Sequence, residues 1–228
     1  MIIKFFLTVI IAILNIILGI IVYKKNNKSK SNRFYRNLCF TGGIWALFMA
    51  ALLIIKDAFV LEHFIIKGIY FFAILPPLYY LLFSFYYPYN LETSQKKLQI
   101  LIYAIPSVMA IFVLLGVLKM ETFQLEHNQI YQTVVYPDYF ILSLYFFGYI
   151  IWGFIRLLNK LNKDSGSYKN QISYLIIATF TTFVFTGSVS IILPLAGTFA
   201  YDWLGPIFLL IHFLTVGYLI FIKTSKAN

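Results

Sequence analysis

The sequence predicts an all-α membrane protein, a seven-transmembrane helix bundle with its N-terminus outside the cell and its C-terminus inside. Apolar residues make up 61% of the 228 residues and charged residues only 11%, whereas soluble domains have about 45–50% and about 25%. Stretches long enough to cross ~30 Å of hydrocarbon recur along the chain. The basic residues gather on one of the two sides that these stretches define.

The seven expected spans follow one another through short connections, so residues 1–228 form a single domain. The first span is too long for the apolar core of a secretory signal, and no small-x-small cleavage site follows it. It is therefore interpreted as a retained helix. The spans are residues 2–23, 37–55, 64–87, 98–118, 139–155, 172–195 and 203–222.

Charge sets the expected orientation. With the N-terminus outside, the inner segments 24–36, 88–97, 156–171 and the tail after Ile222 hold 14 of the 18 basic residues. The net charge is then +12 inside and −2 outside, as the positive-inside rule describes. The basic excess thus predicts the orientation of the chain in a membrane. The lipid bilayer is the expected partner, and no nucleic acid is expected.

Two further segments carry structural signals. The outer loop 119–138 contains two alternating runs on either side of His127-Asn128, a pattern that predicts a short extracellular β-hairpin between the fourth and fifth helices. Aromatic residues crowd the stretch 79–89 at the inner end of the third span. Amphipathic rings favour the headgroup region, so these side chains are expected at the interface.

Ionisable residues inside spans are the first candidates for function, because charge is costly in hydrocarbon. His212 lies about 14 Å along the last span, close to the midplane. It is either a ligand contact or switch, or a neutral imidazole bonded to a neighbouring hydroxyl. Lys67 lies about one turn inside the third span, below the outer residues Asp57 and Asp202. It either binds an anion or closes an ion pair, or else it reaches up to the headgroups.

Small residues and prolines indicate packing and bending. Small side chains at helical spacing allow close helix contact, and their hydroxyls can bond across it; they are Gly42, Ala46 and Ala50, and then Thr182, Thr186 and Ser190. Prolines inside spans free carbonyls and kink helices, which makes Pro76, Pro77 and Pro106 candidate hinges.

Catalytic and cofactor signatures are missing from the sequence. It has no zinc-protease motif, no nucleophile elbow, no phosphate-binding glycine loop and no pair of intramembrane aspartates. Cys39 is the single cysteine, so no cysteine metal cluster can form. The chain is therefore not expected to be an enzyme, and no metal or cofactor is expected.

Residues along the whole chain resemble the seven-transmembrane N-terminal region of sensor histidine kinases. The order and spacing of short motifs carry the resemblance. The motifs are Asn15 to Gly19, Lys30-Ser31-Asn32-Arg33-Phe34, Trp45, Lys67-Gly68, Pro76-Pro77, Phe83, Asn170 to Tyr174, Gly187, Leu193-Pro194, Gly197, Asp202, Leu204-Gly205-Pro206 and Gly217 to Ile220.

The resemblance implies a sensory input module in a bacterial inner (cytoplasmic) membrane, which transmits a stimulus through the seventh helix. It implies a cytoplasmic partner, a kinase, a PAS domain or a diguanylate cyclase, acting in trans, and a homodimer by analogy. The chain is expected to be either a stand-alone sensor or a piece of a split or truncated kinase. The candidate ligand or switch residues are Lys67, His212, Trp45, Asp57 and Asp202. A small transporter or channel subunit and an assembly factor are the alternative functions.

Overall fold

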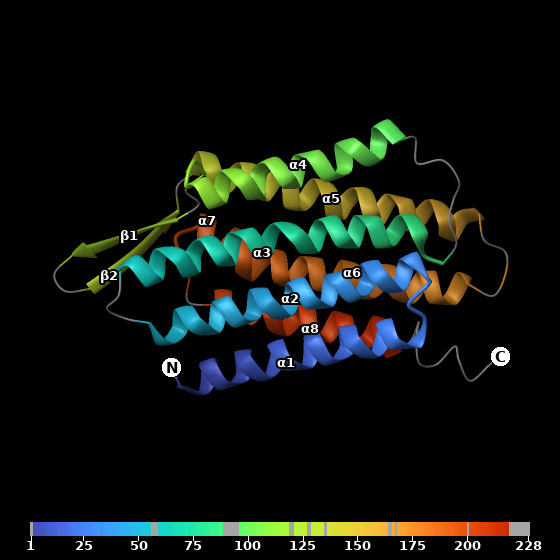
Figure 1. Ribbon diagram of the computed structural model, residues 1–228, viewed down its shortest axis with the longest axis horizontal. Helices are drawn as coiled ribbons and strands as arrows, with labels where there is room; N and C mark the ends of the chain where they lie inside the picture. Colours follow the sequence, from blue (N-terminus) through green and yellow to red (C-terminus); the bar gives the residue numbers. More distant parts are fainter. Residues whose placement is uncertain are drawn as a thin grey trace.

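The computed structural model describes residues 2–55, 59–88, 96–118, 121–126, 129–134, 136–163, 166, 168–199 and 201–218, and all statements below concern these residues. Long helices run side by side along one axis (Figure 1). The elements in chain order are α1 (Ile2–Lys25), α2 (Lys30–Ile54), α3 (Phe59–Tyr86), α4 (Lys96–Leu115), β1 (Glu121–Glu126), β2 (Gln129–Val134), α5 (Tyr136–Lys163), α6 (Lys169–Gly187), the π-helical η1 (Ser188–Ile192), α7 (Leu193–Leu195), the 3₁₀ turn η2 (Asp202–Leu204) and α8 (Gly205–Val216).

The helices are apolar enough to form a membrane bundle. Five of them have the length and composition to cross a membrane, namely Ile2–Lys25, Lys30–Ile54, His63–Tyr86, Pro137–Lys163 and Lys169–Leu195. Two shorter apolar helices are also present. Ile100–Leu115 lies within the fourth expected span, and Asp202–Val216 begins one residue before the seventh. Large apolar side chains face outward, such as Ile3 at 82% and Leu115 at 70% exposure. Such a surface suits lipid, since soluble monomers rarely expose large apolar patches.

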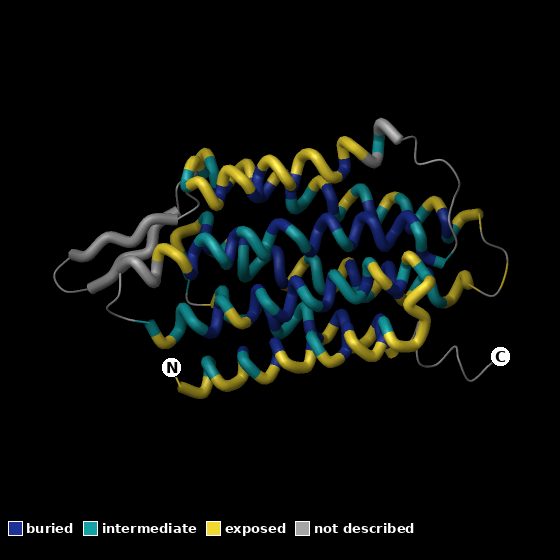
Figure 2. Tube along the Cα trace, in the orientation of Figure 1, coloured by how far each residue is buried: buried dark blue, intermediate teal, exposed yellow. Residues whose placement is uncertain are grey.

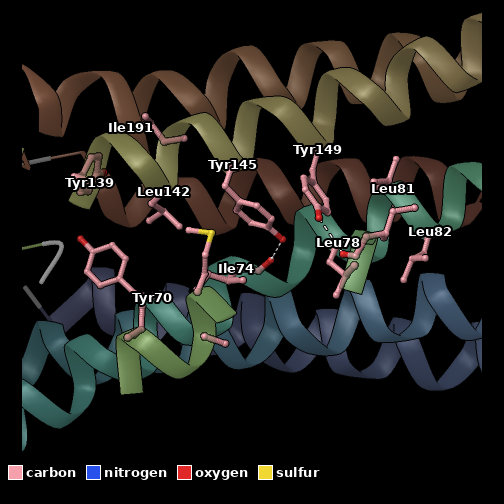
Figure 3. Close-up of a cluster of buried hydrophobic side chains, with 14 of the residues drawn as sticks. Tyr70, Ile74, Leu78, Leu81, Leu82, Tyr139, Leu142, Tyr145, Tyr149 and Ile191 are labelled. Carbon is pink, nitrogen blue, oxygen red and sulfur yellow. Dashed lines mark hydrogen bonds between the residues drawn. The ribbon is translucent and has the colours of Figure 1, made fainter. Parts of the chain in front are cut away.

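The third helix occupies the middle of the bundle. It packs against α2, α4 and α5, while α8 packs against α1, α2 and α6. Exposed residues line the outer faces of α1 and α4, which form opposite edges, and α3 between them is mostly buried (Figure 2). Figure 3 shows the core between α3 and α5, where Ile74, Leu78 and Leu81 meet Leu142 and Tyr145.

The two ends of the bundle differ. The strands β1 and β2 pair antiparallel, from Glu121 opposite Val134 to Glu126 opposite Gln129, and project from the end at which α1 begins (Figure 1). We call this the hairpin end. At the other end α1, α3 and α5 finish, and basic residues such as Lys25, Arg33 and Lys163 collect there. We call it the basic end.

Two local features go beyond the expectations. Three of the aromatic residues near the end of α3 lie inside the bundle: Tyr80, Phe83 and Phe85 are at most 4% exposed, with Tyr35 of α2 beside Phe83 and Trp152 of α5 beside Phe85. The fifth helix also continues past residue 155 to Lys163, so Arg156 and Lys160 lie on a helix and not in a loop. Charged residues at a helix end were indistinguishable from loop residues in the sequence.

The sixth span contains a π-helical turn that the sequence did not predict. The Leu193 amide bonds to the Ser188 carbonyl, which is five residues earlier. Pro194 follows directly and has no amide hydrogen to continue the α-helical ladder. Single π turns inside α-helices are frequent at functional sites, and this one borders the cavity described next.

Candidate functional site: a cavity in the helix bundle

A partly open cavity of about 110 Å³ lies between α2, α3, α5, α6 and α8. An ordered water needs only ~10–15 Å³, so this space has room for several waters or a small molecule. Most of its lining is aliphatic or aromatic, with a few hydroxyl, indole and imidazole groups among the apolar side chains. Such a lining is typical of small-molecule sites.

Helical periodicity places the polar lining groups. Thr179, Thr182, Thr186 and Ser190 follow one another at spacings of three or four residues along α6 and η1, so they form one stripe toward the cavity. His212 lies on α8, one residue before Phe213, whose ring also lines the cavity. Thr182, Thr186 and Ser190 were predicted to mediate helix packing, and the structure places them along the cavity.

Six buried polar atoms on the cavity lining lack a hydrogen-bond partner within the described part of the chain. They belong to side chains from α2, α3, α6, η1 and α8 and are Trp45 Nε1, Tyr80 OH, Thr179 Oγ1, Thr186 Oγ1, Ser190 Oγ and His212 Nδ1. Buried polar groups in native proteins are nearly always bonded. The grouping of these six side chains around one cavity makes it the candidate ligand site.

Some of these groups lie near another polar group but form no hydrogen bond with it. The hydroxyl of Tyr80 approaches that of Thr179 across the α3–α6 contact, but neither forms a hydrogen bond of acceptable geometry. The imidazole of His212 lies near the backbone of Ala178, and its Nδ1 remains without a partner. The sequence left His212 either as a switch or as a packed neutral imidazole, and the structure places it on the cavity.

Aromatic residues pack at the end of the cavity nearest the hairpin. The hydroxyl of Tyr139 donates to the Ser190 carbonyl at 2.6 Å. In an α-helix this carbonyl would accept the amide of residue 194, which is a proline. The Tyr139 ring also meets Tyr70 edge to face, at 6.2 Å between centroids. A Cβ on Gly205 would contact Ser190 and Trp45, so α8 begins directly against this end.

The five predicted ligand or switch residues separate into groups. Trp45, Asp202 and His212 all line the cavity. Lys67 does not: its Nζ donates to the Leu114 carbonyl at 3.3 Å and joins α3 to α4. Asp57 lies outside the described residues. Their roles remain predictions.

The predicted packing and hinge residues are also located. Gly42 lets Phe213 approach, since a Cβ there would be 2.9 Å from the ring. Ala46 and Ala50 are buried in α2. Pro76 and Pro77 line the cavity while α3 remains helical through them, and Pro106 lies inside α4.

Sequence reasoning missed Tyr80, Thr179 and Lys160. Tyr80 was grouped with interfacial rings and Lys160 with loop charges. Lys160 is buried, and its ammonium donates to the carbonyls of Ser84, Phe85 and Tyr87 at 2.9, 2.9 and 2.6 Å. These carbonyls lie at the end of α3, where the last turn lacks internal partners. The four-residue spacing from Arg156 to Lys160 is helical, and it could have indicated that the fifth helix continues through these residues.

The whole-chain comparison decides the family. The family model described as the N-terminal 7TM region of histidine kinase matches residues 7–224, nearly the full length. The chain belongs to this family. A comparison with curated proteins found no match. In histidine kinases the N-terminal 7TM region is a membrane-embedded, non-catalytic input region, so the present member is a multi-pass membrane protein of the sensory type.

Proposed function

We propose that this N-terminal 7TM region detects a stimulus in its central cavity and transmits it through α8 to a cytoplasmic signalling protein. The output is a kinase, a PAS domain or a diguanylate cyclase on the cytoplasmic side. The observation that carries the proposal is the convergence of unpaired polar atoms on a cavity that α8 helps to enclose. A change in occupancy of that cavity alters the contacts of the helix nearest the output.

Contacts along α8 support this route. Tyr35 of α2 donates to the Phe213 carbonyl at 2.6 Å, and the Phe213 ring packs beside Gly42. Further along, Gly217 lies next to Leu18 of α1. A movement of α8 at His212 therefore changes its contacts with α1 and α2 toward the basic end. Signalling of this kind needs two packings a few kcal/mol apart and a ligand that prefers one.

The proposal includes the finer topology. Seven crossings place the N-terminus and the β1–β2 hairpin outside the cell and the basic end inside a bacterial inner membrane. The charge asymmetry of the sequence supports this direction. A homodimer would follow the behaviour of related kinases.

The test joins the C-terminus of the full chain to the soluble core of a histidine kinase and measures autophosphorylation in membranes. We expect His212→Ala to change the output, because it alters a cavity wall on α8, and Lys67→Ala to change it through the α3–α4 contact. Thr181→Val, on the exposed face of α6, is the control. If both alanine variants insert normally and give unchanged output, the proposed transmission from the cavity through α8 is wrong.

A transporter or channel subunit is the second candidate, because a cavity with polar groups inside a helix bundle also suits a permeation path. Flux of ions and small solutes in vesicles that contain the purified chain separates the two functions. A sensor gives flux no greater than that of protein-free vesicles. If the chain gives flux above this level and His212→Ala abolishes it, transport replaces sensing as the proposed function.

A further inference from the structure

We propose that the ligand of the cavity is a small uncharged molecule with an apolar body and an oxygen that accepts a hydrogen bond. This inference rests on the proposed sensory function, since it names the chemical class of the stimulus. It is carried by the arrangement of apolar surface, unpaired donors and charge around the cavity.

The lining selects an apolar body. Apolar side chains from α3, α5, α6 and α8 form much of the wall, among them Ile69, Ala73, Leu142, Phe146, Phe183 and Leu209. Removing apolar surface from water contributes roughly 25 cal/mol per Å². A cavity with this lining therefore favours an aromatic or branched aliphatic molecule over a sugar or an amino acid.

The unpaired atoms select an acceptor oxygen. The indole of Trp45 can only donate, through Nε1, and this atom is buried without a partner in the described structure. The hydroxyls of Thr186 and Ser190 can donate or accept. A carbonyl or hydroxyl oxygen satisfies the indole, and a hydroxyl ligand can also donate to a threonine. A pure hydrocarbon leaves these groups unsatisfied, at a cost.

Charge on the lining argues against an ionic ligand. The described lining contains neither lysine nor arginine, so a carboxylate or phosphate would enter without a countercharge, which is costly in a buried site. Lys67 is engaged with the Leu114 carbonyl and lies off the cavity. The one carboxylate on the lining, Asp202, already has an interaction partner. An ammonium group would have to compete with that partner.

The test uses four one-ring probes that differ in one group: benzyl alcohol, toluene, benzylamine and benzoate. The full chain is prepared with fluorotryptophan and placed in lipid nanodiscs, and the fluorine NMR signal of Trp45 is followed. Loss of that signal in Trp45→Phe assigns it. We expect benzyl alcohol to shift it saturably and to bind at least about threefold more tightly than toluene. The two ions should give no saturable shift.

Variants separate the site from the bilayer. Thr186→Val keeps the shape and removes one hydroxyl, so it should weaken benzyl alcohol binding about three- to tenfold; Tyr80→Phe is a second variant of the same kind. Thr181→Val, on the exposed face of α6, should bind as the parent chain does. Tighter binding of either ion, equal binding of toluene and benzyl alcohol, or no effect of both cavity variants would overturn the inference.

A separate experiment tests whether the natural ligand comes from the bilayer or from water. Solvent extraction of the purified chain followed by mass spectrometry detects a neutral molecule taken from the bilayer, enriched over the Thr186→Val extract. Benzyl alcohol binding with no enriched molecule assigns an aqueous source. The binding experiment needs no output domain, so it is independent of the kinase-fusion experiment. A negative result in either experiment leaves the result of the other unchanged.

Discussion

The hydroxyl of Tyr149 donates a 2.9 Å hydrogen bond to the carbonyl of Ile102. In an uninterrupted α-helix that carbonyl would accept the amide of residue 106, which is a proline and has no amide hydrogen. A side chain of α5 thus supplies the donor that α4 lacks. Tyr139 does the same for Ser190, which precedes Pro194 by four residues. Such bonds satisfy the carbonyls that a proline leaves without an amide donor in a membrane helix, where water is scarce.

The first prediction concerns this bond. Tyr149→Phe should lower the free energy of unfolding by about 0.5–1.5 kcal/mol, because the Ile102 carbonyl becomes an unpaired buried acceptor. Thermal unfolding of the purified chain in detergent measures the change. In a Pro106→Ala background, residue 106 regains an amide donor, and the loss caused by Tyr149→Phe should shrink. An equal loss in both backgrounds would show that the bond does not compensate for the proline.

Lys160 carries the second prediction. Replacing it with methionine removes the ammonium that three carbonyls at the end of α3 accept. We expect a loss of roughly 2–4 kcal/mol in unfolding free energy, since charge-assisted bonds at a helix C-terminus are lost together. The matched control is Lys163→Met, an exposed lysine on the same helix, which should unfold as the parent does. Similar stabilities of the two variants would contradict a capping role.

Gly153 carries the third prediction. A Cβ there would lie 2.5 Å from Cε1 of Tyr80, so Gly153→Ala should force the Tyr80 ring into the cavity or push α5 from α3. We expect a lower melting temperature, consistent with the ~1–3 kcal/mol typical of overpacking. Gly148→Ala is the control, because no atom lies within 4 Å of its Cβ position. A Gly153→Ala chain as stable as this control would mean that Tyr80 moves freely.

The fourth prediction concerns orientation. Cys39 is buried, and in a Cys39→Ala background single cysteines can be placed at Asn27 and Ala196, both exposed at opposite ends. A membrane-impermeant maleimide should label the cysteine at 196 in intact cells and the one at 27 only after permeabilisation. The positive-inside distribution of charge is the reason. The reverse labelling pattern would overturn the N-out orientation.

Much of the architecture could be predicted, since it depends on short-range patterns. Runs such as 2–23 are apolar without interruption, and in hydrocarbon a helix satisfies the whole backbone by itself. The expected family was confirmed by a match over residues 7–224. The helix ends were less accurate: residues 156–163 continue α5, because tertiary contacts stabilise a charged last turn that local composition assigns to a loop.

The site could be predicted only in part. His212 stood out because a lone imidazole in an apolar span is conspicuous, and it does line the cavity. Lys67 stood out for the same reason but lies on the α3–α4 contact. Tyr80 and Thr179 look ordinary among many tyrosines and threonines. They matter because of where α3 and α6 meet, and no spacing in the chain indicates that meeting.

The sequence by itself determined a helical membrane protein, its charge asymmetry and its family, because hydrophobicity and charge act residue by residue against the bilayer. Only the tertiary structure decided that Trp45 and His212, far apart in the chain, share one cavity, and that Lys160 ends α3 inside the bundle. The physical reason is that a buried polar atom is satisfied or left unpaired by its neighbours in space, and those neighbours are set by the packing of helices.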